Sequence, residues 1–212
     1  MIDAAKMAVL VNQKLCHDFA QPLNALVTGL DLLRSAGLAE RAPDAMSLLE
    51  QGVAKHQATL QFFRYALDDS GDASDGGLDD LRETADLLYA QLRPDLRWSA
   101  PPMAMPKPAL RVIMTLLHIA ADAAPRGAVE VDAGPGEVRI IASGPKSKLK
   151  PDSAAALRGE PLEGEYNGRS ILPGLAGQLA RRHGIEIAMR ESEDRVEIIV
   201  RSPAFRAVSA AA

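Results

Sequence analysis

Apolar residues recur every three or four positions through most of the first third of the chain, a pattern typical of amphipathic helices. One periodic stretch runs from about Asp3 to Ala36 and is followed by Gly37, a common residue just after a helix. A second stretch begins at Pro43, which suits a first helical turn, and continues to about Asp68. The pattern therefore predicts a helical hairpin with a short connection.

The second predicted helix has the apolar spacing of a helical bundle. Alternating steps of three and four place these side chains along one side: Met46, Leu49, Val53, His56, Leu60, Phe63 and Leu67. A single hairpin cannot cover the apolar faces of both helices, so we predict that two copies of the chain form a dimeric four-helix bundle. We interpret His56, the polar member of the series, as a hydrogen-bonded core histidine that sets the register of the bundle.

A run rich in Gly, Ser and Asp separates this hairpin from a second half with a different pattern. There the spacing predicts helices near residues 78–92, 107–123 and 170–182, and strands near 97–98, 128–132, 137–141, 185–189 and 195–200. This order predicts an antiparallel-rich sheet with helices on one face, and an α+β protein overall. We divide the chain into a helical hairpin domain (1–69), a linker (70–77), an α/β domain (78–205) and a disordered tail (206–212).

One face of the first helix carries a histidine among uncharged polar side chains. A rotation of about 100° per residue from Leu15 places His17 opposite the apolar band, facing solvent. We expect Asp18 to accept a hydrogen bond from Nδ1 of His17, which leaves Nε2 free to accept a phosphoryl group. Lys14, one turn earlier, would neutralise part of the phosphoryl charge. The same face holds the residues that we expect to dock a partner: Gln13, Gln21, Asn24 and Thr28.

The residues from the histidine onward resemble the H-box of sensor histidine kinases. In His17-Asp18-Phe19-Ala20-Gln21-Pro22-Leu23 an acid follows the histidine, and a proline that predicts a local helix bend lies five positions on. The hairpin and the α/β half are similar to the dimerisation and ATP-binding domains of those kinases. The resemblance implies that His17 is the phosphorylated residue.

The nucleotide-binding motifs of those kinases are not preserved. Ile119 stands where the N-box helix supplies an asparagine for Mg²⁺, and an aliphatic side chain cannot ligate that ion. Ala142-Ser143-Gly144-Pro145-Lys146 replaces the expected Asp-x-Gly-x-Gly, so the acid for the adenine amine is missing. Together with the segment from Ala120 to Gly127, these losses resemble the ChpT-type histidine phosphotransferases of alphaproteobacteria.

This second resemblance implies a homodimer whose bundle histidine accepts a phosphoryl group from a receiver-domain aspartate and passes it to another response regulator, without binding ATP. The implied partners are the receiver domain of a hybrid kinase such as CckA and regulators such as CtrA and CpdR. Mg²⁺ would belong to the partner's acidic site, so the chain would need no cofactor or metal of its own. Two alternatives stay open: a divergent ATP-dependent sensor histidine kinase core, and a noncatalytic scaffold that binds a response regulator.

Composition narrows the remaining classes of function. The 212 residues carry a net charge of -4, which argues against nucleic-acid binding through phosphate contacts. Cys16 is the only cysteine, so an internal disulfide is excluded and a reducing compartment is favoured. The sequence has neither a long apolar run nor a signal-peptide pattern, and we expect a cytoplasmic protein with no membrane contact.

Overall fold

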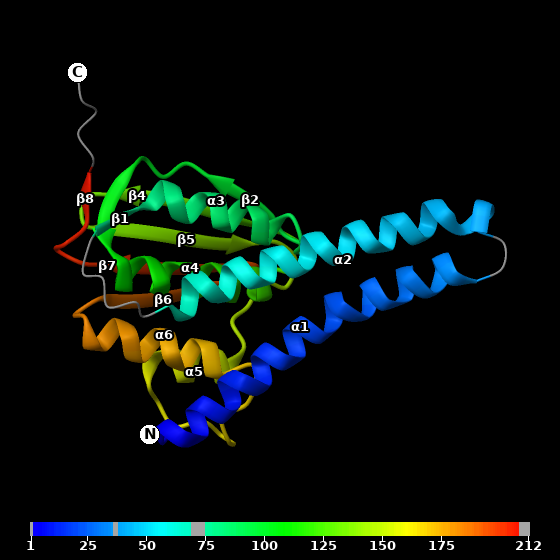
Figure 1. Cartoon of the computed structure of the whole chain (residues 1–212). Coiled ribbons are helices and arrows are strands. Elements are labelled where there is room, and N and C mark those ends of the chain that lie inside the picture. Colours follow the sequence, from blue (N-terminus) through cyan, green and yellow to red (C-terminus); the bar gives the residue numbers. More distant parts are fainter. Residues whose placement is uncertain (1, 36–37, 69–74, 208–212) are drawn as a thin grey trace.

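Two long helices project from an α/β half in the computed structural model (Figure 1). The structure describes residues 2–35, 38–68 and 75–207, apart from the side chains of residues 38–41, 75 and 207. The helices are α1 (Ala4–Arg34), α2 (Leu38–Leu67), α3 (Leu78–Tyr89), α4 (Lys107–Ala123), α5 (Pro151–Arg158) and α6 (Ile171–Arg182). The strands are β1 (Asp75–Gly77), β2 (Asp95–Trp98), β3 (Met103–Pro106), β4 (Ala128–Gly134), β5 (Glu137–Ser143), β6 (Glu186–Ser192), β7 (Arg195–Arg201) and β8 (Arg206–Ala207). The predicted α+β class is confirmed, and no helix within the described ranges has the length and apolar content needed to cross a membrane.

The hairpin of α1 and α2 closes tightly because a glycine lies at the contact on each helix. A Cβ atom on Gly29 would lie 2.8 Å from Cγ of Leu49, and one on Gly52 would lie 2.8 Å from Cδ2 of Leu26. Such distances are shorter than the van der Waals contact distance between two carbon atoms, so only glycine permits the two helices to lie this close together. α1 runs through Pro22 as one helix, and α2 begins at Leu38, before the proline at which the sequence pattern places its start.

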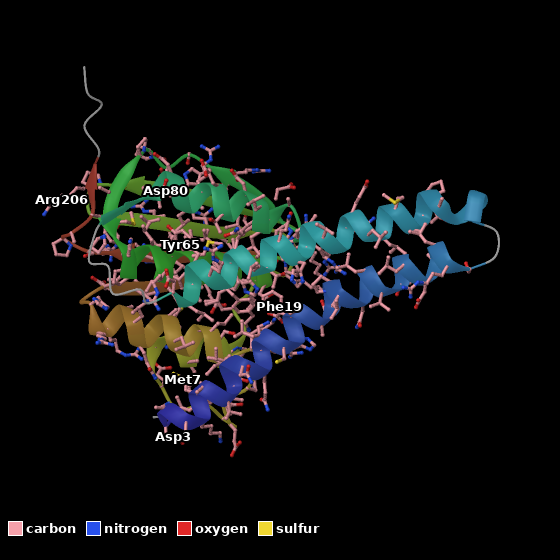
Figure 2. All side chains as sticks on the ribbon, in the orientation of Figure 1. Asp3, Met7, Phe19, Tyr65, Asp80 and Arg206 are labelled. Atoms are coloured by element: carbon pink, nitrogen blue, oxygen red, sulfur yellow. The ribbon has the colours of Figure 1, made fainter. Side chains whose placement is uncertain are left out.

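The two helices separate as they approach the α/β half (Figure 1). α2 contacts α3 and α4 there, whereas α1 contacts α6. Phe19 lies near the point of separation (Figure 2), and its ring centroid is 5.1 Å from that of His56 and 5.9 Å from that of Phe63. Near the start of α1, Lys6 Nζ lies 2.9 Å from a carboxylate oxygen of Glu165. Residues of α1, α2 and α4 border an open space at this separation.

The α/β half is built on a five-stranded sheet with the order β2-β4-β5-β7-β6. β2 pairs with β4 in parallel, and the other neighbours are antiparallel. Val138, Ile140 and Ala142 alternate along β5 and are fully buried, so one face of the sheet is covered. α3, α4 and α6 contact the strands, in agreement with the predicted antiparallel-rich sheet with helices on one face.

Short strands occur where a linker and a disordered tail are predicted. β1 and β8 both pair with β3, forming a separate three-stranded sheet. The prediction is therefore wrong for residues 75–77 and 206–207, while residues 69–74 and 208–212 lie outside the described residues. Packing explains why residue 76 is a glycine, because a Cβ atom there would lie 2.6 Å from Cδ1 of Leu110. The glycines that the sequence analysis assigns to a linker thus allow β1 to lie close to α4.

Candidate functional site

His17 lies on α1 at the border of an open groove between the helical hairpin and the α/β half. The groove has a volume of about 790 Å³ and is bordered by α1, α2, α4 and the segments on either side of α5. The His17 side chain is exposed, as the periodicity of α1 predicts. Its ring is therefore open to a partner that enters the groove.

Lys14 and Asp18 form an ion pair beside this histidine. Lys14 Nζ lies 2.6 Å from Oδ2 and 2.9 Å from Oδ1 of Asp18, and the two side chains are 19% and 20% exposed. A spacing of four residues brings these groups together on the helix, whereas neighbouring residues such as His17 and Asp18 point in different directions. The structure thus differs from the expected Asp18–His17 hydrogen bond, because the Asp18 carboxylate contacts Lys14 instead.

The predicted docking residues are all exposed on α1, but only two of them border the groove. Gln13 and Gln21 lie beside His17 at its edge. Asn24 and Thr28 lie further along α1, and the Thr28 hydroxyl donates to the Asn24 carbonyl oxygen at 2.9 Å. The structure therefore brings Gln13 and Gln21 together with the histidine and leaves Asn24 and Thr28 outside the groove.

The opposite wall of the groove carries groups that helical periodicity alone does not single out. His118 on α4 stacks on Phe62, with ring centroids 4.9 Å apart and an interplanar angle of 26°. Asp122, one turn later, accepts from Lys150 Nζ at 3.1 Å. Burial lowers the pKa of His118, the charges of Lys14 and Lys150 add to this effect, and those of Asp122 and Asp18 oppose it. The packing role predicted for His118 is correct, yet its ring also borders the groove.

α2 contributes a lysine to the same groove. Lys55 Nζ donates to Oε1 of Gln21 at 3.3 Å, across the two helices. Lys55 and Gln21 are 34 residues apart in the chain, so this contact depends on how the hairpin closes. In the sequence, Lys55 lies outside the apolar series of α2, which indicates a surface position but does not point to His17.

His56 lies between the helices rather than in the groove. Its ring contacts Phe19, and its Nδ1 atom is buried with no hydrogen-bond partner among the described residues. The interpretation of His56 as a core residue agrees with this position, but the structure shows no hydrogen bond at Nδ1, and the ring packs against Phe19.

A much smaller cavity lies where the kinase resemblance places a nucleotide. It measures about 50 Å³ and is bordered by α4, the start of α5 and the start of α6. Ile119 borders it and is only 6% exposed. Such a volume holds a few water molecules, whereas pockets for small-molecule ligands and cofactors usually span about 300 to 1,000 Å³. Within the described residues, no group of His, Cys, Asp and Glu is arranged to hold a metal ion.

Comparison with known proteins defines the class of this protein. Residues 78–195 match the family described as "Histidine phosphotransferase C-terminal domain", and the chain belongs to this family. It is 26% identical over 203 residues to the protein phosphotransferase ChpT of Brucella abortus (strain 2308), covering 92% of this chain and 95% of that relative. The fold also matches a 1.7 Å structure of a bacterial phosphotransferase, with a TM-score of 0.82, 23% identity, and 94% and 98% of the two chains covered. The resemblance to ChpT-type phosphotransferases is thereby confirmed.

Proposed function

We propose that this protein is the histidine phosphotransferase of a two-component phosphorelay. His17 accepts a phosphoryl group from the aspartate of one receiver domain and passes it to the aspartate of another. The observation that carries the proposal is the exposed His17 ring at the border of a large open groove, in a chain of the histidine phosphotransferase family. The groove admits a partner's carboxylate to the histidine.

In the transfer step, Nε2 of His17 forms a nitrogen–phosphorus bond while the phosphorus–oxygen bond to the receiver's aspartate breaks. The electron pair of the broken bond stays on the aspartate, and the new imidazolium gives its Nδ1 proton to water. Mg²⁺, held by the receiver's own acidic residues, would neutralise charge on the transferring group. Because the Lys14 ammonium contacts the Asp18 carboxylate, Asp18 repels the incoming phosphoryl group less than a bare carboxylate would.

The hairpin carries an uncovered apolar surface that fits a second copy of the chain. We call it the apolar stripe; its members are Leu23, Val27 and Leu30 on α1 and Met46, Val53 and Leu60 on α2, each between 41% and 54% exposed. The α2 members alternate with Leu49 and Phe63, which turn toward α1 or the core. Burying the apolar stripe against its counterpart in a homodimeric four-helix bundle would remove it from water.

The proposed partners are receiver domains: one belongs to a hybrid histidine kinase similar to CckA, and others belong to response regulators similar to CtrA and CpdR. The small cavity at Ile119 supports the further proposal that the transfer uses no bound ATP. Gln13 and Gln21 at the groove, and Asn24 and Thr28 beyond it, would form the docking face.

The experiment that tests the proposal incubates the full chain with a phosphorylated receiver and Mg²⁺ and follows the label. We expect label on the wild type and on a His56→Ala control, and none on His17→Ala. Label that appears from ATP without any receiver would favour the kinase alternative. Receiver binding without label on any variant would favour the scaffold alternative. Either outcome would overturn the proposed phosphorelay role.

A further inference from the structure

The cations that border the groove differ in how their charges are balanced. They are Lys14, Lys55, Lys150 and Arg169. Lys14 contacts Asp18, and Lys150 contacts Asp122, so each of these two charges is offset by a carboxylate. Lys55 contacts only the uncharged amide of Gln21, and no carboxylate of the described residues lies within ion-pair distance of it. Its positive charge is therefore available to a bound anion.

The position of Lys55 relative to His17 follows from helix geometry. Gln21 comes four residues after His17, and at about 1.5 Å per residue this separation is roughly 6 Å along the same side of α1. Because Lys55 Nζ already lies 3.3 Å from the Gln21 side chain, its ammonium is about one helical turn from the imidazole. The flexible lysine side chain spans such a distance by a change of rotamer. Arg169 lies in the segment between α5 and α6 and also borders the groove.

We propose that Lys55 is a further catalytic residue, whose ammonium leaves Gln21 and binds the phosphoryl oxygens when His17 is phosphorylated. This inference rests on the proposed function of His17. A phosphoryl group carries about two negative charges, and charge-assisted hydrogen bonds to it are stronger than the lysine's bond to a neutral amide. The lysine stays protonated throughout, so it neither gives nor takes a proton in the transfer.

The same contact acts in both directions of transfer. As the group moves between His17 and a receiver aspartate, charge collects on its three equatorial oxygens, and a nearby ammonium stabilises that charge. Only the nitrogen–phosphorus and phosphorus–oxygen bonds change, and Lys55 follows the oxygens. Lys14 is less suited to this task, because moving its ammonium to phosphate would leave the Asp18 carboxylate unbalanced beside the reacting group.

The test measures how the phosphoryl group divides between a receiver and His17 at equilibrium, using the full chain and three variants. Lys55→Gln removes the charge, Lys55→Arg keeps it, and Lys146→Gln removes an exposed lysine outside the groove. We expect Lys55→Gln to shift the equilibrium toward the receiver by about fivefold, given the strength of a charged hydrogen bond at an exposed site. Lys55→Arg should recover most of this loss, and Lys146→Gln should match the wild type.

A merely structural role for Lys55 predicts different results. In that case Lys55→Gln would lower the thermal unfolding temperature while the equilibrium of phosphoryl transfer stayed unchanged. Added salt gives an independent readout, because it should narrow the gap between the wild type and Lys55→Gln by screening the exposed charge. Label on His17 with equal equilibria in all variants would overturn the role of Lys55 alone. Loss of label from wild-type His17 would instead overturn the proposed function.

Discussion

Replacing Leu30 with Asp tests the proposed dimer within the apolar stripe. Leu30 lies in the apolar stripe, and its side chain is 45% exposed in the single chain. In a symmetric dimer each substitution occurs twice, so its effect on association is doubled. Leu87 provides a matched control, because it is 55% exposed but lies on α3, outside the apolar stripe.

The size of the effect follows from the exposed fraction of the side chain. Full burial of a leucine is worth about 1.5 to 3 kcal/mol, and roughly half of Leu30 is still available for burial, giving about 1 kcal/mol per copy. Two copies contribute about 2 kcal/mol, which corresponds to roughly a 30-fold change in the dissociation constant. The buried carboxylate adds a desolvation cost, so we expect Leu30→Asp to weaken the dimer at least 30-fold, in order of magnitude.

Sedimentation equilibrium over a series of protein concentrations measures this change directly. The wild type and Leu87→Asp should share one dissociation constant, while Leu30→Asp should sediment as a monomer at concentrations where both remain dimers. Equal dissociation constants for all three proteins, or a wild type that is monomeric at every concentration, would refute the reasoning from the apolar stripe.

Three further substitutions probe the groove and the hairpin. Lys14→Gln leaves the Asp18 carboxylate unbalanced and should slow phosphotransfer about three- to tenfold, with Lys14→Gln/Asp18→Asn recovering part of the rate in a labelled transfer assay. Burial lowers the pKa of His118, so below about pH 6.5 the unfolded chain binds a proton at this residue that the folded chain does not bind. The free energy of unfolding of the wild type should therefore decrease as the pH is lowered, by up to about 1.4 kcal/mol per pH unit. Urea titrations of His118→Gln should lack this decrease. Gly52→Val should destabilise the fold by about 1 to 3 kcal/mol in thermal unfolding, because its Cβ would lie 2.8 Å from Leu26.

Elements with strong periodicity could be predicted from the sequence almost to the residue. The helix predicted near residues 107–123 is α4 (Lys107–Ala123), because an apolar run starts at a proline that suits the first turn. The two predicted hairpins of the sheet are β4–β5 and β6–β7, and each observed strand ends one to three residues after the predicted end. The periodic alternation of apolar and polar residues is a local property, so each of these elements can be predicted from its own segment of the sequence.

Elements held by tertiary contacts could not be predicted in this way. β1 and β8 consist of three and two residues, too few to show alternation, and they exist because each pairs with β3. α5 (Pro151–Arg158) has only eight residues and is largely buried against α6. At the site, periodicity places His17 outward correctly, but the Lys14–Asp18 pair and the Lys55–Gln21 contact depend on rotamers and on the closure of the hairpin.

The α/β half shapes the groove at His17 because it determines where the first turns of α1 lie. The first turns of α1 contact α6 and reach Glu165, so α1 leaves α2 near Phe19 and the groove opens beside His17. In the sensor histidine kinases that the sequence resembles, the corresponding helix contributes to the nucleotide site. Here Ile119 of α4 is buried, and His118 borders the groove. A chain that ended at Leu67 would lose the contacts that separate the helices, and with them the wall that faces the histidine. The geometry of the groove therefore requires the α/β half.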